Sequence, residues 1–296
     1  MIKEIPASIK WPLVIILLVL SSSLDFVGEK QFPLNKEMII DNQLKATQNH
    51  IMNEKILFIH GFPMSKKIWK SQINELSGTH YCTAVDLPGY GDRAASKNFI
   101  HSIDSYADFV KQYIEENNLG RVHIIAMSMG GSIALNMSRR YPEIIASIAL
   151  IHTSAVADTH DEKQNRNKTI ADIENGGLAE FIEFFADRLL SPDASSETKR
   201  KYISDMMEAS EETVIAGYKA IRDRADEFSH LKRLEIPVLL VAGSDDVGSS
   251  PEEMKSMANE IRNSTFEIIE GCGHVAPLEK PEVLNQILVD WISKQE

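Results

Sequence analysis

The sequence predicts an α/β fold with a mostly parallel β-sheet. From residue 38 onward, short apolar runs rich in β-branched residues alternate with longer runs in which apolar residues recur at helical spacing. The short runs contain few polar positions, which is typical of strands covered on both faces. Strands that alternate with helices in this way form parallel sheets with helices packed on both sides.

The same patterns locate the individual elements. Strands are expected at 56–59, 81–85, 122–126, 147–151, 238–242 and 265–269. Helices are expected at 103–114, 129–140, 251–262 and 281–294. The last two begin with a proline, whose missing N–H is harmless in the first turn of a helix.

The alternation stops between residues 155 and 234, where helical patterns occur without a convincing strand. We therefore predict a helical insertion in this part of the chain. The apolar residues expected to form its packing face are Phe181, Phe184, Phe185, Leu189 and Leu190.

A serine lies between the third expected strand and the helix that follows it. Residues 126–131 read AMSMGG, with Ser128 directly after the strand. A nucleophile on a sharp strand-to-helix turn needs small neighbours two residues before and after it, here Ala126 and Gly130. Such a turn exposes the hydroxyl at the carboxyl edge of the sheet, where a helix N-terminus favours negative charge. The alternative is an ordinary junction in which Ser128 caps the helix.

Three further strand ends carry the groups that a serine nucleophile requires, namely a base, a carboxylate that orients it, and N–H donors for an oxyanion. The turn after the first strand offers the Phe62 amide, and the Met129 amide beside the serine is the second donor. A loop with Asp245 and Asp246 follows the strand at 238–242. His274 lies on a glycine-rich turn after the last strand.

These motifs resemble one family. HGFP at 60–63, AMSMGG at 126–131, VAGSDD at 241–246 and GCGHVAPLEKPE at 271–282 are similar to the α/β-hydrolase superfamily, above all to its carboxylesterase and 3-oxoadipate enol-lactonase-like branch. The resemblance runs from about Glu54 to the end of the chain. It implies a catalytic domain over residues 36–296 with an eight-stranded, mostly parallel sheet and flanking helices. It also implies a helical lid after the sixth strand, which matches the insertion at 155–234.

The resemblance further implies roles for individual residues. The family's acid stands three residues after the glycine of the loop behind the seventh strand, which favours Asp246 over its neighbour Asp245. Cys82 would lie on the fourth strand and Cys272 after the eighth. A disulfide requires α-carbons within about 7 Å, so we expect no disulfide between them.

The expected activity is that of a serine hydrolase that cleaves small carboxylic esters or lactones through an acyl-enzyme, with Ser128 as nucleophile, His274 as base and Asp246 as the orienting acid. Hydrolysis of a carbon–carbon bond, or a cofactor-free perhydrolase reaction, would use the same triad. A non-catalytic ligand-binding relative of the fold is a further alternative. No cofactor is expected, and no metal site, because the remaining histidines lack ligand spacing with Cys, Asp or Glu.

Two other histidines lie at strand ends. His60 is expected to stabilise its turn through hydrogen bonds of its ring, without acting as a base. His152 is expected either to line the pocket or to be a structural residue.

The amino-terminal segment differs from the rest of the chain. Residues 11–20 read WPLVIILLVL, with Lys3 and Lys10 before them and serines at 21–23. Ten helical residues rise about 15 Å, too short for a bilayer core of about 30 Å. The pattern fits a secretory signal peptide over residues 1–23, or an uncleaved leader that contacts a membrane, and hence an exported or membrane-associated protein. A mis-assigned start codon, and with it a cytoplasmic protein, is the alternative.

The charge of the chain bears on its partners. Lys and Arg number 31 and Asp and Glu 43, which gives a net charge of −12. Nucleic-acid binding depends on Lys and Arg clusters that face phosphates, and the sequence has no such cluster. We therefore expect a small-molecule ester or lactone as the partner and no nucleic acid, while the oligomeric state stays open.

Overall fold

The computed structural model describes residues 54–94 and 99–295. These residues belong to one unit of the chain, which spans Gln48–Glu296. The predicted signal peptide over residues 1–23 lies outside the described residues, as does the start of the catalytic domain predicted at residue 36. Among the described residues, no helix combines the length and the apolar character needed to cross a membrane.

One sheet forms the centre of the described chain, and all its neighbouring strands run parallel. Its strands are Lys55–Ile59 (β1), Tyr81–Val85 (β2), Val122–Met127 (β3), Ile145–Ile151 (β4), Val238–Gly243 (β5) and Ser264–Ile269 (β6). They lie in the order β2-β1-β3-β4-β5-β6. Every expected strand is present, and its ends differ from the expectation by at most two residues.

The number of strands differs from what the family resemblance implied. The sheet of the described residues has six strands, so the expectation of eight was wrong for this part of the chain. That expectation counted the strand at 81–85 as the fourth and therefore required two more strands before β1. Residues 1–53 precede β1 and are not described.

Helices connect the strands. They are Lys70–Leu76 (α3), Ile103–Glu116 (α4), Met129–Arg140 (α5), His160–Glu174 (α6), Leu178–Leu189 (α7), Ser196–Met206 (α8), Glu211–Arg222 (α9), Pro251–Glu260 (α10), Ala276–Glu279 (α11) and Pro281–Ile292 (α12). Short 3₁₀ helices occupy Lys66–Trp69 (η3), Gly91–Arg93 (η4), Pro142–Ile144 (η5) and Phe228–Arg233 (η6).

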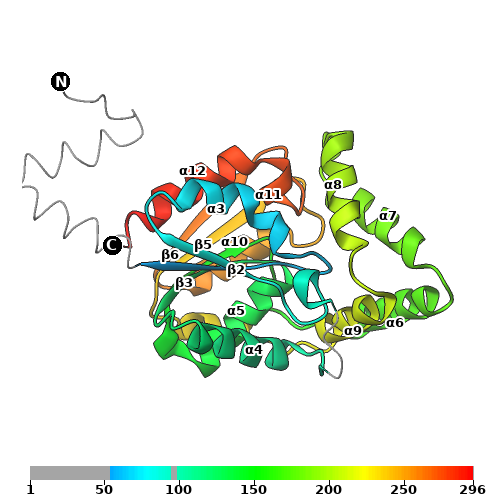
Figure 1. Cartoon of the computed structure of the whole chain (residues 1–296), viewed down its shortest axis with the longest axis horizontal. Coiled ribbons are helices and arrows are strands. Elements are labelled where there is room, and N and C mark those ends of the chain that lie inside the picture. The colour runs from blue at the N-terminus through cyan, green and yellow to red at the C-terminus, as the bar shows by residue number, and fades with distance from the viewer. Residues whose placement is uncertain (1–53, 95–98, 296) are drawn as a thin grey trace, which may run out of the picture. The chain divides into compact units, whose positions relative to one another are not determined.

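The strand order determines which face each helix covers. The chain moves from β1 to the edge strand β2, returns past β1 to β3, and then proceeds through β4 and β5 to β6. Because parallel crossovers are right-handed, this reversal places α3 on one face and α4, α5 and α10 on the other. Figure 1 shows α3 with α12 on one side of the sheet and α4 with α5 on the opposite side. The central strands β3 and β5 are buried along their whole length.

The reversal also defines where a ligand is expected. In open parallel sheets, ligands bind beyond the carboxyl ends of the strands, at the point where the strand order reverses. Here that point lies between β1 and β3. The turn that starts at His60 and the turn with Ser128 follow these two strands, so the topology brings them together.

Helices α6 to α9 lie between β4 and β5. Figure 1 shows them to one side of the sheet and its covering helices. Most of the apolar group expected on their packing face is buried or half-buried. Phe184 is the exception, because 62% of it is exposed. Its inclusion in the packing face was wrong. Phe184 lies on the solvent side of α7 together with the exposed Glu183, whereas the next residue, Phe185, is half-buried.

The two cysteines lie at opposite edges of the sheet. Cys82 is on the edge strand β2, and Cys272 follows the other edge strand, β6. Both are free thiols. This agrees with the expectation that they form no disulfide.

Candidate active site

Ser128 lies on a sharp turn between β3 and α5. Its φ of 53° and ψ of −120° belong to a region that few non-glycine residues adopt. Its side chain forms no capping hydrogen bond with α5, so the interpretation of Ser128 as an ordinary helix cap is wrong. At Gly130 a Cβ would lie 2.6 Å from the carbonyl oxygens of Ile59 and His60. The turn is therefore packed directly against the end of β1.

Ser128, His274 and Asp246 form one chain of hydrogen bonds. The Ser128 Oγ lies 2.9 Å from Nε2 of His274, and Nδ1 of His274 lies 3.0 and 2.9 Å from the two carboxylate oxygens of Asp246. An ionised carboxylate only accepts hydrogen bonds, so Nδ1 carries the proton and Nε2 accepts from the serine hydroxyl. The structure thus brings together three residues that lie far apart in the sequence.

The neighbouring carboxylate, Asp245, points elsewhere. Its Oδ1 accepts a hydrogen bond from the Ser244 hydroxyl at 2.9 Å, and it forms no hydrogen bond with His274. Of the two acids on this loop, only Asp246 contacts the imidazole.

Asp246 is almost fully buried and strongly hydrogen-bonded. Its Oδ1 accepts the backbone N–H groups of Gly248 at 2.7 Å and Ser249 at 3.1 Å, and its Oδ2 accepts the Ser249 hydroxyl at 2.9 Å. Burial alone would raise the pKa of Asp246. The charge of His274 and the hydrogen bonds from His152 and His274 outweigh burial and hold that pKa well below its usual value. The carboxylate is therefore ionised at neutral pH.

The two backbone N–H groups expected to stabilise an oxyanion flank Ser128. Met129 is the first residue of α5, so its N–H has no acceptor within the helix. Phe62 follows Gly61, where a Cβ would lie 3.0 Å from the Cβ of Ser128. The Phe62 N–H forms no hydrogen bond with another described residue. Both donors are therefore free to bind an incoming oxygen atom.

His60 has the role in the turn that the sequence predicts. It is fully buried, its Nδ1 donates to the Gly61 carbonyl at 2.8 Å, and its Nε2 accepts the Leu87 N–H at 3.0 Å. Burial lowers the pKa of His60, so the ring is neutral. Its two hydrogen bonds join the turn after β1 to the segment after β2.

The helical insertion contacts the site in two places. Aromatic rings form the first contact: Phe62 lies 6.0 Å from Phe185 of α7 and 5.5 Å from Tyr218 of α9, measured between ring centroids. Backbone groups form the second, because the His274 N–H donates to the Leu189 carbonyl at 2.7 Å. The insertion therefore contacts both the turn that carries Phe62, called here the oxyanion turn, and the loop that carries His274, called here the histidine loop.

Glu279 of α11 joins the same segments. Its carboxylate accepts three backbone N–H groups, those of Ser191 at 2.8 Å, Gly273 at 3.2 Å and Val275 at 3.0 Å. The first belongs to the end of the insertion, and the other two flank His274. The resemblance that located His274 gave no role to this glutamate.

His152 contacts Asp246, which the sequence did not predict. Its Nδ1 lies 3.0 Å from Oδ2 of Asp246, and its ring centroid lies 5.6 Å from that of His274. It is fully buried. Of the two predicted alternatives, its burial fits the structural position, while the partner Asp246 was not predicted.

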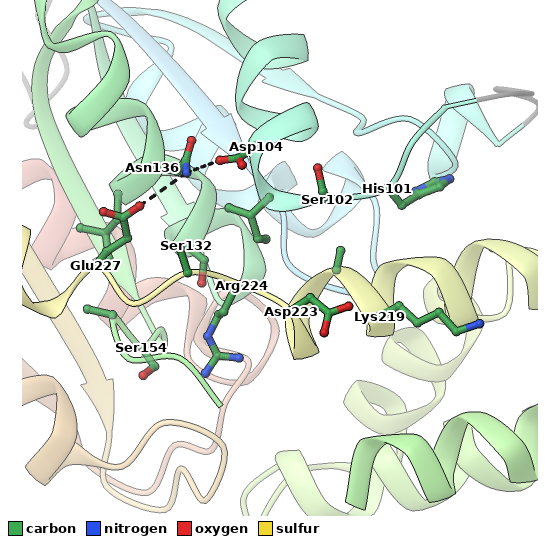
Figure 2. A pocket seen from close by; sticks show the side chains of 15 residues that line it. His101, Ser102, Asp104, Ser132, Asn136, Ser154, Lys219, Asp223, Arg224 and Glu227 are labelled. Atoms are coloured by element: carbon green, nitrogen blue, oxygen red, sulfur yellow. Dashed lines mark hydrogen bonds between the residues drawn. The ribbon is translucent and has the colours of Figure 1, made fainter. Parts of the chain in front are cut away.

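A separate cavity of about 190 Å³ lies between α4, α5 and α9. Figure 2 shows polar side chains around it, with Asn136 hydrogen-bonded between Asp104 and Glu227. Ser132, one turn after Ser128 on α5, lines it. None of the predicted catalytic or oxyanion residues does, so this cavity is distinct from the site.

The side chains of His152, Asp246 and His274 are also of the types that bind metal ions, and their ligand atoms lie within 4.8 Å of one another. Their nitrogen-to-oxygen distances of 2.9 and 3.0 Å are those of hydrogen bonds. Two ligands of a tetrahedral zinc ion, each about 2.1 Å from the metal, would lie about 3.4 Å apart. The distances between these three side chains therefore fit hydrogen bonds better than the coordination of one metal ion.

With this geometry in view, comparison with known proteins identifies the family. Residues 55–281 match the family described as alpha/beta hydrolase fold. The chain therefore belongs to the α/β-hydrolase superfamily, as the resemblance of its motifs implied.

Three similar proteins indicate which members of the superfamily this chain resembles. A thermophilic esterase from Thermogutta terrifontis is 29% identical, with a TM-score of 0.77 over 82% of this chain and 90% of the esterase. The (E)-2-((N-methylformamido)methylene)succinate hydrolase of Acinetobacter baylyi is 25% identical and is matched over 81% of this chain and 90% of its own length. An enol-lactonase from Burkholderia xenovorans shares the fold, with 17% identity and a TM-score of 0.74 over 81% and 91% of the two chains. The esterase and the hydrolase are relatives of the kind that the motifs resemble, and the enol-lactonase shows the shared fold.

Proposed function

We propose that this protein is a serine hydrolase that cleaves small carboxylic esters or lactones through an acyl-enzyme. The observation that carries the proposal is the hydrogen-bonded chain from Ser128 through His274 to Asp246, at the carboxyl edge of the sheet. The esterase and hydrolase relatives support it.

In the first half of the reaction, the Ser128 Oγ attacks the carbonyl carbon and its proton moves to Nε2 of His274. The carbonyl oxygen becomes an oxyanion, which the N–H groups of Phe62 and Met129 bind. The charge that develops on the imidazole is stabilised by Asp246. The carbon–oxygen bond to the alcohol then breaks, and His274 gives its proton to the leaving oxygen.

In the second half, a water molecule takes the place of the alcohol. His274 removes a proton from this water, whose oxygen attacks the acyl carbon. The second tetrahedral oxyanion uses the same two N–H groups. Its collapse releases the carboxylic acid and returns the proton to Ser128, so the enzyme needs no net supply of protons or electrons.

We propose that the insertion acts as the lid over this site. The contacts of Phe185 and Tyr218 with Phe62 support this role, because they place α7 and α9 against the oxyanion turn. Ligand pockets are mostly apolar, and these rings supply an apolar wall. Substrate size would then depend on side chains of the insertion, while bond cleavage depends on the sheet edge.

The test is a panel of p-nitrophenyl esters and small lactones, assayed with the wild type, Ser128→Ala and Ser132→Ala. We expect Ser128→Ala to lower kcat at least about 10⁴-fold and to abolish labelling by a fluorophosphonate. Ser132→Ala, a matched change one helical turn away, is expected to keep both. If the wild type hydrolyses nothing on the panel and is not labelled at Ser128, the proposal is wrong.

A further inference from the structure

The carboxylate of Asp246 receives more hydrogen bonds than the orientation of one histidine requires. The loop around it supplies two backbone N–H groups and the Ser249 hydroxyl. Nδ1 of His274 donates a further hydrogen bond to the carboxylate. The last position, on Oδ2, is taken by Nδ1 of His152, which comes from the end of β4 and not from the acid loop. Two imidazoles therefore share one carboxylate.

The surroundings of His152 define its protonation. Because the carboxylate is ionised and only accepts, Nδ1 of His152 is the protonated nitrogen. Its other ring nitrogen, Nε2, is buried and has no hydrogen-bond partner among the described residues. Burial lowers the pKa of His152, and the hydrogen bond that its ring donates to Asp246 opposes this only in part. The ring is therefore a neutral donor with a bare second nitrogen.

The backbone holds His152 in an unusual position. Its φ is 47°, in the left-handed region, where Asn and Asp are the non-glycine residues found most often. Its N–H donates to the Val241 carbonyl at 3.0 Å, so the residue turns from β4 toward β5 and the acid loop. The next residue, Thr153, donates its hydroxyl to the Ser128 carbonyl at 2.7 Å. Residues 152 and 153 thus join the acid to the nucleophile turn.

Other titratable groups also face this cluster. Glu279 of α11 and the buried hydroxyl of Tyr202 on α8 lie close enough to affect its charges. The Glu279 carboxylate is engaged by three backbone N–H groups. Cys272 precedes His274, and burial raises the pKa of its thiol. On the acid loop itself, Asp245 points away toward Ser244. Among the described residues, His152 is the only imidazole besides that of His274 that donates a hydrogen bond to Asp246.

We propose that His152 is a positioning residue: its neutral Nδ1–H holds the Asp246 carboxylate toward His274 and absorbs part of its negative charge. The inference rests on the proposed function, because it assigns His274 the role of base. A donor on the carboxylate spreads its charge and weakens its pull on the neighbouring imidazolium. Loss of this donor therefore leaves more of the carboxylate charge to act on the His274 ring.

The matched variants are His152→Asn and His152→Gly. Asn tolerates the positive φ and places an amide N–H close to the position of Nδ1, whereas Gly tolerates the same φ and provides no donor. Thermal unfolding shows first that both variants are folded at the assay temperature. The readouts are kcat, KM and the pH profile of kcat/KM with a p-nitrophenyl ester.

We expect His152→Gly to lower kcat by about tenfold or more, because the carboxylate is no longer held toward His274, with little change in KM. The acidic limb of its kcat/KM profile is expected to move to higher pH. His152→Asn is expected to restore kcat to within about threefold of the wild type and to return the acidic limb of the kcat/KM profile to its wild-type pH. If Asn and Gly have the same kcat and the same limb as each other, the ring serves packing alone and the proposal is overturned.

A measurement that needs no substrate separates this proposal from the proposed function. In ¹⁵N-histidine NMR spectra at neutral pH, His152 is expected as the neutral tautomer with its proton on Nδ1. A proton on Nε2 in an active enzyme overturns the positioning role. A wild type that neither hydrolyses esters nor reacts with a fluorophosphonate overturns the proposed function instead, whatever the tautomer.

Discussion

The carboxyl edge of the sheet and the helical insertion are built in different ways. At the edge, Ser128, Asp246 and His274 each follow a strand by a few residues, and the parallel register brings them within hydrogen-bond distance. In the insertion, only part of each helix is buried, and its contact with the site is made by rings such as Phe185 and Tyr218. Under the proposed function, bond cleavage therefore depends on backbone topology, and substrate fit on individual side chains.

The largest expected effect tests the edge. Asp246→Asn would leave His274 without the acceptor that fixes its tautomer, so we expect kcat to fall about 10⁴-fold. Asp245→Asn is the matched control, because this neighbouring carboxylate contacts Ser244 and not the imidazole. Steady-state kinetics of both variants on one ester checks the prediction. Equal losses, or a larger loss for Asp245→Asn, would show that the acid was chosen wrongly.

A second prediction concerns the backbone of the edge. In Gly130→Ala the added Cβ would lie 2.6 Å from two carbonyl oxygens at the end of β1. The turn must shift, and we expect kcat to fall roughly a hundredfold and the free energy of unfolding to fall by about 2 kcal/mol. Gly78→Ala is the control, because nothing lies within 4 Å of its added Cβ. Unfolding in urea and ester kinetics measure the two effects. An unchanged Gly130→Ala enzyme would contradict the close packing of the turn.

The insertion is expected to respond differently. Phe185→Ala removes the ring that contacts Phe62 and Phe181. We expect KM to rise about tenfold for longer acyl chains, with kcat within about threefold of the wild type. Phe184→Ala removes an adjacent ring that is 62% exposed, and it is expected to change neither value. A large fall in kcat with constant KM would remove the distinction between the two regions.

The smallest expected effect is on stability and involves both regions. Burial lowers the pKa of His60, His80, His101, His152 and His230 in the folded protein. Below about pH 6.5 the unfolded chain takes up protons at these residues that the folded protein does not, so stability falls as the pH falls. We expect Tm to drop by a few degrees between about pH 7.5 and about pH 5.5, in about 0.5 M salt to screen surface charges. A constant or rising Tm would contradict these shifts.

Much of the edge was predictable because its signals are local. Each expected strand was a short, nearly continuous apolar run, and the small residues around Ser128 revealed the turn directly. The insertion was harder. Helix α6 buries only Ile170 and Ile173, so its sequence lacks a periodic apolar face. In α3 the short sequence KSQINEL buries only Gln72 and Leu76, and it was not predicted for the same reason.

The contacts of the acid show where sequence reasoning ends. Asp246 could be chosen from the family resemblance of its loop, but the direction of the His152 ring depends on a positive φ after β4 that no motif encodes. The same holds for Glu279. Its three acceptor contacts join segments that are far apart in the sequence, so the role of this carboxylate becomes visible only in three dimensions.

Glu279 also limits how this enzyme can be rebuilt. The insertion is attached to the histidine loop by the Glu279 carboxylate and by the Leu189 carbonyl, and at Gly273 a Cβ would lie 2.4 Å from that same carbonyl. These contacts constrain any exchange of the insertion for that of a relative. The graft must retain the junction at 189–191 together with Gly273 and Glu279, because these parts form one module with His274.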